Sequence, residues 1–202
     1  MKSIFVTFLV LAFIPFYAIS QDTIGADADK SMRIALMFGG LKNYPIDEYL
    51  HNAEGRINPV VALQVYLIEE DRIKLQTGLT FYQRWFRMPF SLGYWNNYLT
   101  DERNAGYTLI QLPFNVLYQP IRKVGLSAII GIYSSYPISA SREVYNDRVL
   151  EMGVRAGLQY ELVLTHHISL SVRSEFEYPI RDFGNIYTMP SLFVLGGVGF
   201  KL

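Results

Sequence analysis

The chain has 202 residues, with 18 basic and 18 acidic side chains, no cysteine, and half of its residues hydrophobic. This near-neutral balance, without a basic cluster, argues against a nucleic-acid partner. The lack of cysteine excludes disulfides and a lipoprotein-type anchor, and the length suits a single domain.

The first 20 residues have the pattern of a secretory signal peptide. Lys2 supplies the positive start, residues 4–17 the apolar stretch, and Ala18-Ile19-Ser20 the small-x-small end. The alternative is a transmembrane anchor, but Pro15 interrupts the stretch and no positively charged stop follows it. We expect cleavage after residue 20, a short periplasmic segment over 21–30, and one domain over 31–202.

After the leader, the chain alternates apolar and polar residues in short runs, which is typical of strands with two different faces. In the run that starts at Ile73, one parity is apolar and the other carries Lys74, Gln76, Thr80, Tyr82 and Arg84. The pattern predicts eight strands, over residues 31–40, 57–69, 72–86, 106–119, 123–135, 149–163, 167–179 and 188–202. Most exceed the ~9–11 residues that a tilted strand needs to cross a membrane.

Short and long connections alternate between these strands. The connections after the second, fourth and sixth strands are short, and the others, over 41–56, 87–105, 136–148 and 180–187, are longer. Outer-membrane barrels have short periplasmic turns and longer external loops. The sequence therefore predicts an all-β fold, an eight-stranded antiparallel up-and-down transmembrane barrel in the outer membrane of a Gram-negative envelope.

The two faces of the strands agree with this fold. Apolar parities, such as Ile130 with Ile132, are expected to contact outer-membrane lipid, and glycines on the other parity leave room in a narrow lumen. Aromatic residues near both strand ends predict two interfacial girdles: Phe38, Phe81, Trp85, Tyr136, Phe176 and Tyr178 at the loop end, and Tyr118, Tyr160 and Phe200 at the turn end. A soluble lipocalin-like barrel, with the faces inverted around a ligand, is the all-β alternative.

Two central segments resemble a known family. Tyr107-Thr-Leu-Ile-Gln-Leu-Pro113-Phe-Asn-Val-Leu-Tyr118 resembles a strand of small bacterial outer-membrane β-barrel proteins, including the PorT-like group, and Gly125-Leu-Ser-Ala-Ile-Ile-Gly131-Ile-Tyr133 resembles their next strand. The segment 153–160 and the end of the chain, 195–202, are similar to other strands of that family. The resemblance implies an eight-stranded outer-membrane barrel, but members of the family have different roles.

One arrangement is similar to a hydrolase site. Small barrels that deacylate lipid A use a histidine, a serine two residues later and a carboxylate, and His167, Ser169 and Glu175 or Glu177 share one parity. His167, however, follows a short turn at the expected periplasmic end, away from the outer leaflet. Glu175 lies six residues beyond Ser169, or ~20 Å along a strand. We therefore expect no catalytic residue and no enzyme.

The inward charges have two interpretations. Lys74, Arg84, Arg155 and Arg173 balance Glu151, Glu161, Glu175 and Glu177. Because eight strands leave only enough room for side chains, buried pairs that plug the lumen are expected rather than a small pore. No cofactor or metal site is expected, since histidines 166 and 167 are adjacent and point to opposite faces.

The loop after the third strand is the candidate binding surface. Between residues 87 and 105 it concentrates aromatic and arginine side chains, which are enriched at protein interfaces. The candidate residues are Arg87, Phe90, Tyr94, Trp95, Tyr98 and Arg103. The alternative is that these rings fold onto the barrel mouth or lie among lipid headgroups. The sequence thus predicts a non-enzymatic barrel that stabilises the envelope or binds another envelope protein through its external loops.

Overall fold

The computed structural model describes residues 32–44, 54–70, 72–91, 100–121, 124–140, 150–182 and 189–202. The predicted signal peptide over 1–20 and the segment 21–30 lie outside the described residues. Among the described residues, no helix is long and apolar enough to span a membrane.

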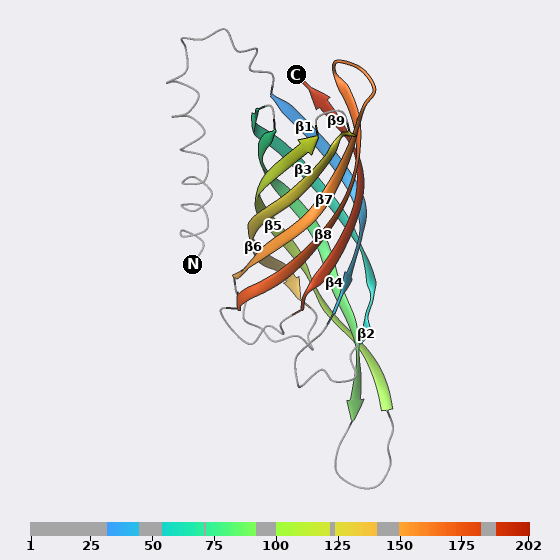
Figure 1. Ribbon diagram of the computed structural model, residues 1–202. Coiled ribbons are helices and arrows are strands. Elements are labelled where there is room, and N and C mark those ends of the chain that lie inside the picture. Colours follow the sequence, from blue (N-terminus) through green and yellow to red (C-terminus); the bar gives the residue numbers. More distant parts are fainter. Residues whose placement is uncertain are drawn as a thin grey trace. The chain divides into compact units, whose positions relative to one another are not determined.

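The described part of the chain is built almost entirely from strands (Figure 1). They are β1 (Arg33–Asn43), β2 (Glu54–Gly55), β3 (Ile57–Glu69), β4 (Ile73–Ser91), β5 (Thr100–Ile121), β6 (Leu126–Ala140), β7 (Glu151–Val163), β8 (Ile168–Asp182) and β9 (Ser191–Lys201). The two-residue β2 pairs only with β4 at the loop end, so eight strands form the wall.

Antiparallel pairing closes these eight strands into a barrel. Each strand pairs with its neighbour in the chain, and β1 pairs with β9 over Arg33↔Lys201 to Asn43↔Ser191, which joins the first strand to the last. Closure pairs the backbone groups of every strand within the cylinder and leaves no free edge along the wall. The predicted eight-stranded antiparallel barrel is confirmed.

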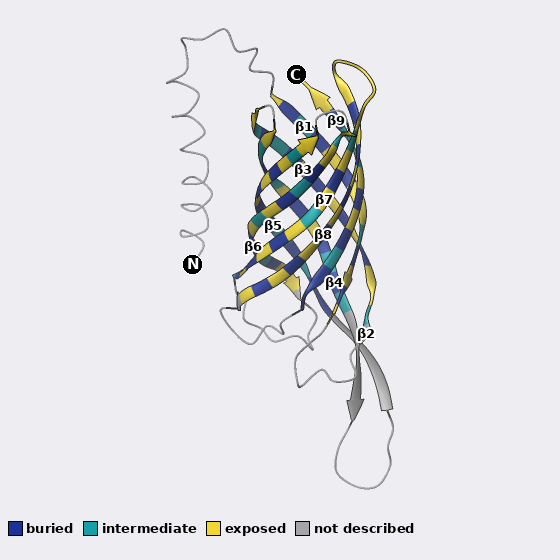
Figure 2. Ribbon diagram, viewed as in Figure 1, coloured by how far each residue is buried: buried dark blue, intermediate teal, exposed yellow. Residues whose placement is uncertain are grey.

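Burial alternates along each strand, as Figure 2 shows by the alternation of buried and exposed segments. Apolar side chains such as Leu63, Ile132 and Val172 are exposed on the outer face, whereas Gln76, Arg84 and other polar side chains are buried inside. The inverted, lipocalin-like arrangement of faces is therefore wrong. Of the predicted aromatic positions, Phe38, Phe81, Phe176 and Tyr178 at one end and Tyr118, Tyr160 and Phe200 at the other are exposed, whereas Trp85 and Tyr136 are half-buried.

The connections alternate as predicted, but the structure corrects several boundaries. Residues 41–43 and 136–140, expected in loops, continue β1 and β6. Residues 87–91 and 100–105, expected in a loop, continue β4 and β5 as a paired hairpin with Phe90↔Asp101 and Ser91↔Thr100. In Figure 1 this hairpin extends beyond the other strands at the end opposite the C-terminus. Gly125, expected in a strand, is instead in the turn before β6, with a φ of 68° that favours glycine.

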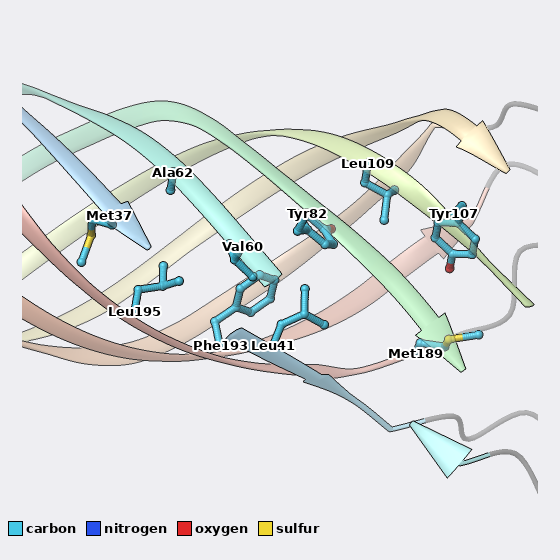
Figure 3. Close-up of a cluster of buried hydrophobic side chains, with 10 residues drawn as sticks. All are labelled: Met37, Leu41, Val60, Ala62, Tyr82, Tyr107, Leu109, Met189, Phe193 and Leu195. Carbon is cyan, nitrogen blue, oxygen red and sulfur yellow. The ribbon is translucent and has the colours of Figure 1, made fainter. Parts of the chain in front are cut away.

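One flank of the lumen is apolar, which the alternating pattern did not predict. A cluster of buried hydrophobic side chains lies along β1, β3 and β9 and reaches across to β4 and β5 (Figure 3). Its members are Met37, Leu41, Val60, Ala62, Tyr82, Tyr107, Leu109, Met189, Phe193 and Leu195. Tyr82 and Phe193 meet edge to face, with ring centroids 5.4 Å apart. This flank of the interior is packed like the core of a soluble domain.

Candidate functional site

The lumen carries charged side chains that are almost completely removed from solvent. Arg84 on β4 is 0% exposed and Glu151 on β7 is 1% exposed. The guanidinium donates through Nη1 to Glu151 Oε2 at 2.6 Å and through Nη2 to Oε1 at 3.2 Å. Ser135 Oγ donates a further hydrogen bond to the same carboxylate at 3.3 Å. This bidentate geometry is the strongest form of an arginine–carboxylate pair.

A second group of charges lies along β7 and β8. Arg155 forms ion pairs with Glu175 at 3.2 Å and with Glu177. Arg173 completes the group by pairing with Glu175 at 3.0 Å. All four side chains are buried, so each charge depends on its neighbours for compensation.

Amide side chains connect these charges across the lumen. Gln76 on β4 accepts from Arg173 Nη2 at 2.7 Å and from Asn115 Nδ2 at 3.1 Å, and it donates to Gln64 at 2.9 Å. Gln111 on β5 donates to Glu177 at 3.0 Å. Hydrogen bonds thus run from β3 through β4 and β5 to β8, across the interior.

A ring of four charges closes the lumen at the short-turn end. Arg33 on β1 and Lys74 on β4 each pair with both Glu69 and Glu161, with Lys74 Nζ 2.9 Å from Glu69 and 3.2 Å from Glu161. Arg33 Nη2 also donates to Ser169 Oγ at 2.8 Å. Arg33 and Glu69 were not among the predicted inward charges. Arg33 shares the parity of the buried Ala35 and Met37, which was the one signal for it. Glu69 follows a register shift between Tyr66 and Ile68 that reverses the parity of β3, so the alternation could not identify it.

The expectation of paired inward charges is therefore confirmed. Each of the predicted cations and carboxylates has a partner of opposite charge across or along the wall. Inward glycines make room for this packing: a side chain at Gly131 or Gly157 would collide with Asn115 or Glu175. The polar flank and the apolar cluster together fill the interior with side chains.

The residues that resemble a hydrolase site are not brought together. Ser169 Oγ accepts from Arg33, and Glu175 is held by Arg155 and Arg173. The Nδ1 atom of His167 lies 3.3 Å from the backbone oxygen of Lys201 rather than beside Ser169. Within the described residues, no cluster of three or more histidine, aspartate or glutamate side chains could hold a metal ion.

The predicted binding surface is only partly placed. Arg87 and Phe90 belong to β4 and Arg103 belongs to β5, where Met88 pairs with Arg103. Tyr94, Trp95 and Tyr98 lie outside the described residues. Three of the six candidate residues thus belong to the paired strands of the hairpin.

Comparisons with known proteins agree with the geometry. No family model and no curated protein matches the chain. Among solved structures, the chain is similar to Neisserial surface protein A, with 11% identity over 85% of this chain and 97% of that one and a TM-score of 0.52. A major outer membrane protein from Thermus thermophilus has 9% identity over 85% of this chain and 99% of that one, with a TM-score of 0.51.

At these identities the likeness concerns the fold, and the chemistry of the two faces agrees with it. Many large apolar side chains are exposed on the outer face, which suits contact with lipid, while the paired charges of the lumen are buried. The chain is an eight-stranded β-barrel of the outer-membrane type.

Proposed function

We propose that this protein is a non-enzymatic, integral outer-membrane barrel that binds another envelope protein through the end carrying its long connections. The observation that carries the proposal is the filled lumen. Arg84, Arg155 and Arg173 are buried in the interior and paired with carboxylates. Because an eight-stranded barrel has room only for side chains, these pairs support a filled lumen rather than a pore. A small pore and a lipid A deacylase using His167 and Ser169 are both disfavoured by these contacts.

The orientation follows from the connections. The short turns after β3, β5 and β7 suit the periplasmic side, and the long connections suit the cell exterior. The signal peptide over 1–20 would deliver the chain to the periplasm, from which barrels insert. The motifs in β5 and β6 support a kinship with the PorT-like group of small barrels.

The β4–β5 hairpin is the proposed docking element. Beyond Arg87, β4 pairs with β5 alone among the described strands, so the hairpin extends past the barrel wall. In the sequence, Phe90 and Arg103 flank the aromatic residues at positions 94, 95 and 98. Aromatic and arginine side chains are the residue types that most often dominate binding energy at interfaces.

Two experiments test the proposal in order. The outer-membrane fraction is first run on detergent gels with and without boiling. A closed barrel resists detergent until it is heated, so we expect a band whose mobility changes on boiling. A soluble periplasmic protein without such a change would contradict membrane residence.

The second experiment tests the hairpin. Residues 90–102 are replaced by a two-residue Asn-Gly turn, which suits an antiparallel hairpin. We expect a folded, heat-modifiable barrel that no longer co-purifies with the protein captured by a photoreactive residue at position 95 of the intact chain. Replacing residues 142–148 in another long connection is the matched control and should retain the adduct. If no adduct forms at position 95 in the intact protein, the barrel has a structural role in the envelope instead.

A further inference from the structure

A pocket of about 550 Å³ opens at the short-turn end of the barrel. Its lining comes from the short-turn ends of β1, β3, β4, β5, β7, β8 and β9 and from the turns beside them, and it includes Arg33, Ser169 and Lys201. Neither the docking hairpin nor the closed central lumen is part of it, because the hairpin leaves the opposite end of the barrel (Figure 1). The pocket therefore calls for a separate explanation.

Three nitrogen-bearing side chains lie in a row across this mouth. Arg33 on β1 is the register partner of Lys201 on β9. The backbone N–H of Lys201 donates to the backbone oxygen of His167 at 2.9 Å, which places His167 on the other side of Lys201. Arg33, Lys201 and His167 all line the pocket.

The charge of the mouth is unbalanced towards the cations. Glu69 and Glu161 are both engaged by Arg33 and Lys74, so these four charges neutralise one another. Lys201 has no ion pair with any carboxylate in the described ranges, and it lines the same pocket. The lining thus holds three cations against two carboxylates, with His166 and His167 beside the unpaired lysine.

Two hydroxyl groups at the mouth keep a donor available. Ser169, only 6% exposed, accepts from Arg33 through its oxygen, and Thr165 Oγ1 accepts from the backbone N–H groups of His167 and Ile168 at 3.2 and 3.0 Å. Each hydroxyl hydrogen remains available for a ligand oxygen. Gly199 maintains this space, because a side chain there would lie 2.7 Å from Ser169 Oγ.

The pocket also adjoins the membrane-facing surface. Tyr160, Leu162 and Ile168 belong to its lining, and all three are exposed on the outer side of β7 and β8 near the turn-end aromatic girdle. A ligand that fits both parts carries an anionic oxygen cluster next to an apolar body. We infer that this mouth is a binding site for a phosphate group, carried by a glycerophospholipid headgroup or by a soluble phosphate ester.

The test uses the folded barrel in uncharged maltoside micelles, titrated with inorganic phosphate and with sn-glycerol 3-phosphate at constant ionic strength. We expect saturable NMR shifts at the amides of Thr165 and His167. Loss of a charge-assisted hydrogen bond in Lys201→Gln should raise the Kd about tenfold. His167→Gln is the second variant, and Lys42→Gln, an exposed lysine at the other end of β1, is the control that should bind as the native protein does.

Nanodiscs of phosphatidylglycerol distinguish the two sources. If lipid headgroups already fill the site, the amide shifts appear in the nanodisc itself and added glycerol 3-phosphate has no further effect. If the soluble ester still produces its shifts there, the soluble ligand is the source. The inference is overturned if the amide signals of Thr165 and His167 shift neither when phosphate is added to the micelles nor in the nanodiscs. It is also overturned if the Lys201→Gln and Lys42→Gln variants bind phosphate with the same Kd.

Discussion

Replacing Glu151 by Gln tests whether the lumen is as dry as its contacts indicate. Gln keeps the size of the side chain but removes the charge that compensates Arg84, whose side chain is completely buried. Arg84 also has a buried Nε atom without a hydrogen-bond partner in the structure, so its compensation depends on its two bonds to Glu151. Removing one partner of a buried ion pair costs ~3–5 kcal/mol, and we expect Glu151→Gln to lose that much free energy of unfolding.

The double variant Arg84→Met, Glu151→Met separates this penalty from the value of the pair. Apolar replacement of a whole buried pair is often neutral or stabilising by ~1–4 kcal/mol, so the double variant should be at least as stable as Arg84→Met alone or Glu151→Met alone. Arg56→Gln, which changes an exposed charge at the loop end, is the control and should stay within ~0.5 kcal/mol of the native protein.

The assay is reversible urea unfolding in lipid vesicles, followed by tryptophan fluorescence and repeated for each member of the cycle. The reasoning is refuted if Glu151→Gln costs less than ~1 kcal/mol, a value typical of exposed pairs. Water would then reach Arg84, and the interior would be a hydrated channel instead of a packed one.

Three further predictions concern the wall, a turn and the lumen. Ile132, which is 58% exposed near the middle of β6, faces lipid, so Ile132→Arg should lose ~2–4 kcal/mol in vesicle unfolding, and an unchanged midpoint would contradict this placement. Gly125→Ala should lower the free energy of unfolding by at least ~1 kcal/mol, because the φ of 68° disfavours alanine and the new side chain would meet the carbonyl oxygen of Glu161. The control is Gly196→Ala, which has open space around it and should be near neutral in the same assay. The native barrel in planar bilayers should give no stepwise conductance, and regular steps would disprove the filled lumen.

The sequence alone was sufficient to predict the number of strands, the two faces of most strands and the closure of the sheet into a barrel. A period of two assigns each side chain to a face without knowledge of its neighbours, which is why Arg84 and Glu151 could be placed inside. The partners of these charges could not be predicted. They depend on strand tilt and stagger, which set the level at which side chains from distant strands meet across the lumen.

The corrections arise where alternation is weak. Residues 87–91 include Pro89, and residues 100–105 are mainly polar, so neither segment shows the alternation of a half-buried strand; they are strands because they pair with each other. The inward placement of Met37 and Leu195 was difficult to predict for a different reason. Strands β1 and β9 carry apolar residues on both parities, so their inward face looks the same as the outward one in the sequence.

The position of the lumen pairs has a consequence for how the protein enters a bilayer. Arg84 and Glu151 belong to β4 and β7, and Arg33 and Glu161 to β1 and β7, so these two pairs join strands that are not neighbours in the sheet. A partly assembled sheet in hydrocarbon would hold these charges apart and unpaired, at a cost of several kcal/mol for each ion. Insertion and closure are thus thermodynamically coupled, because a partly closed barrel in the membrane is less stable than the closed one.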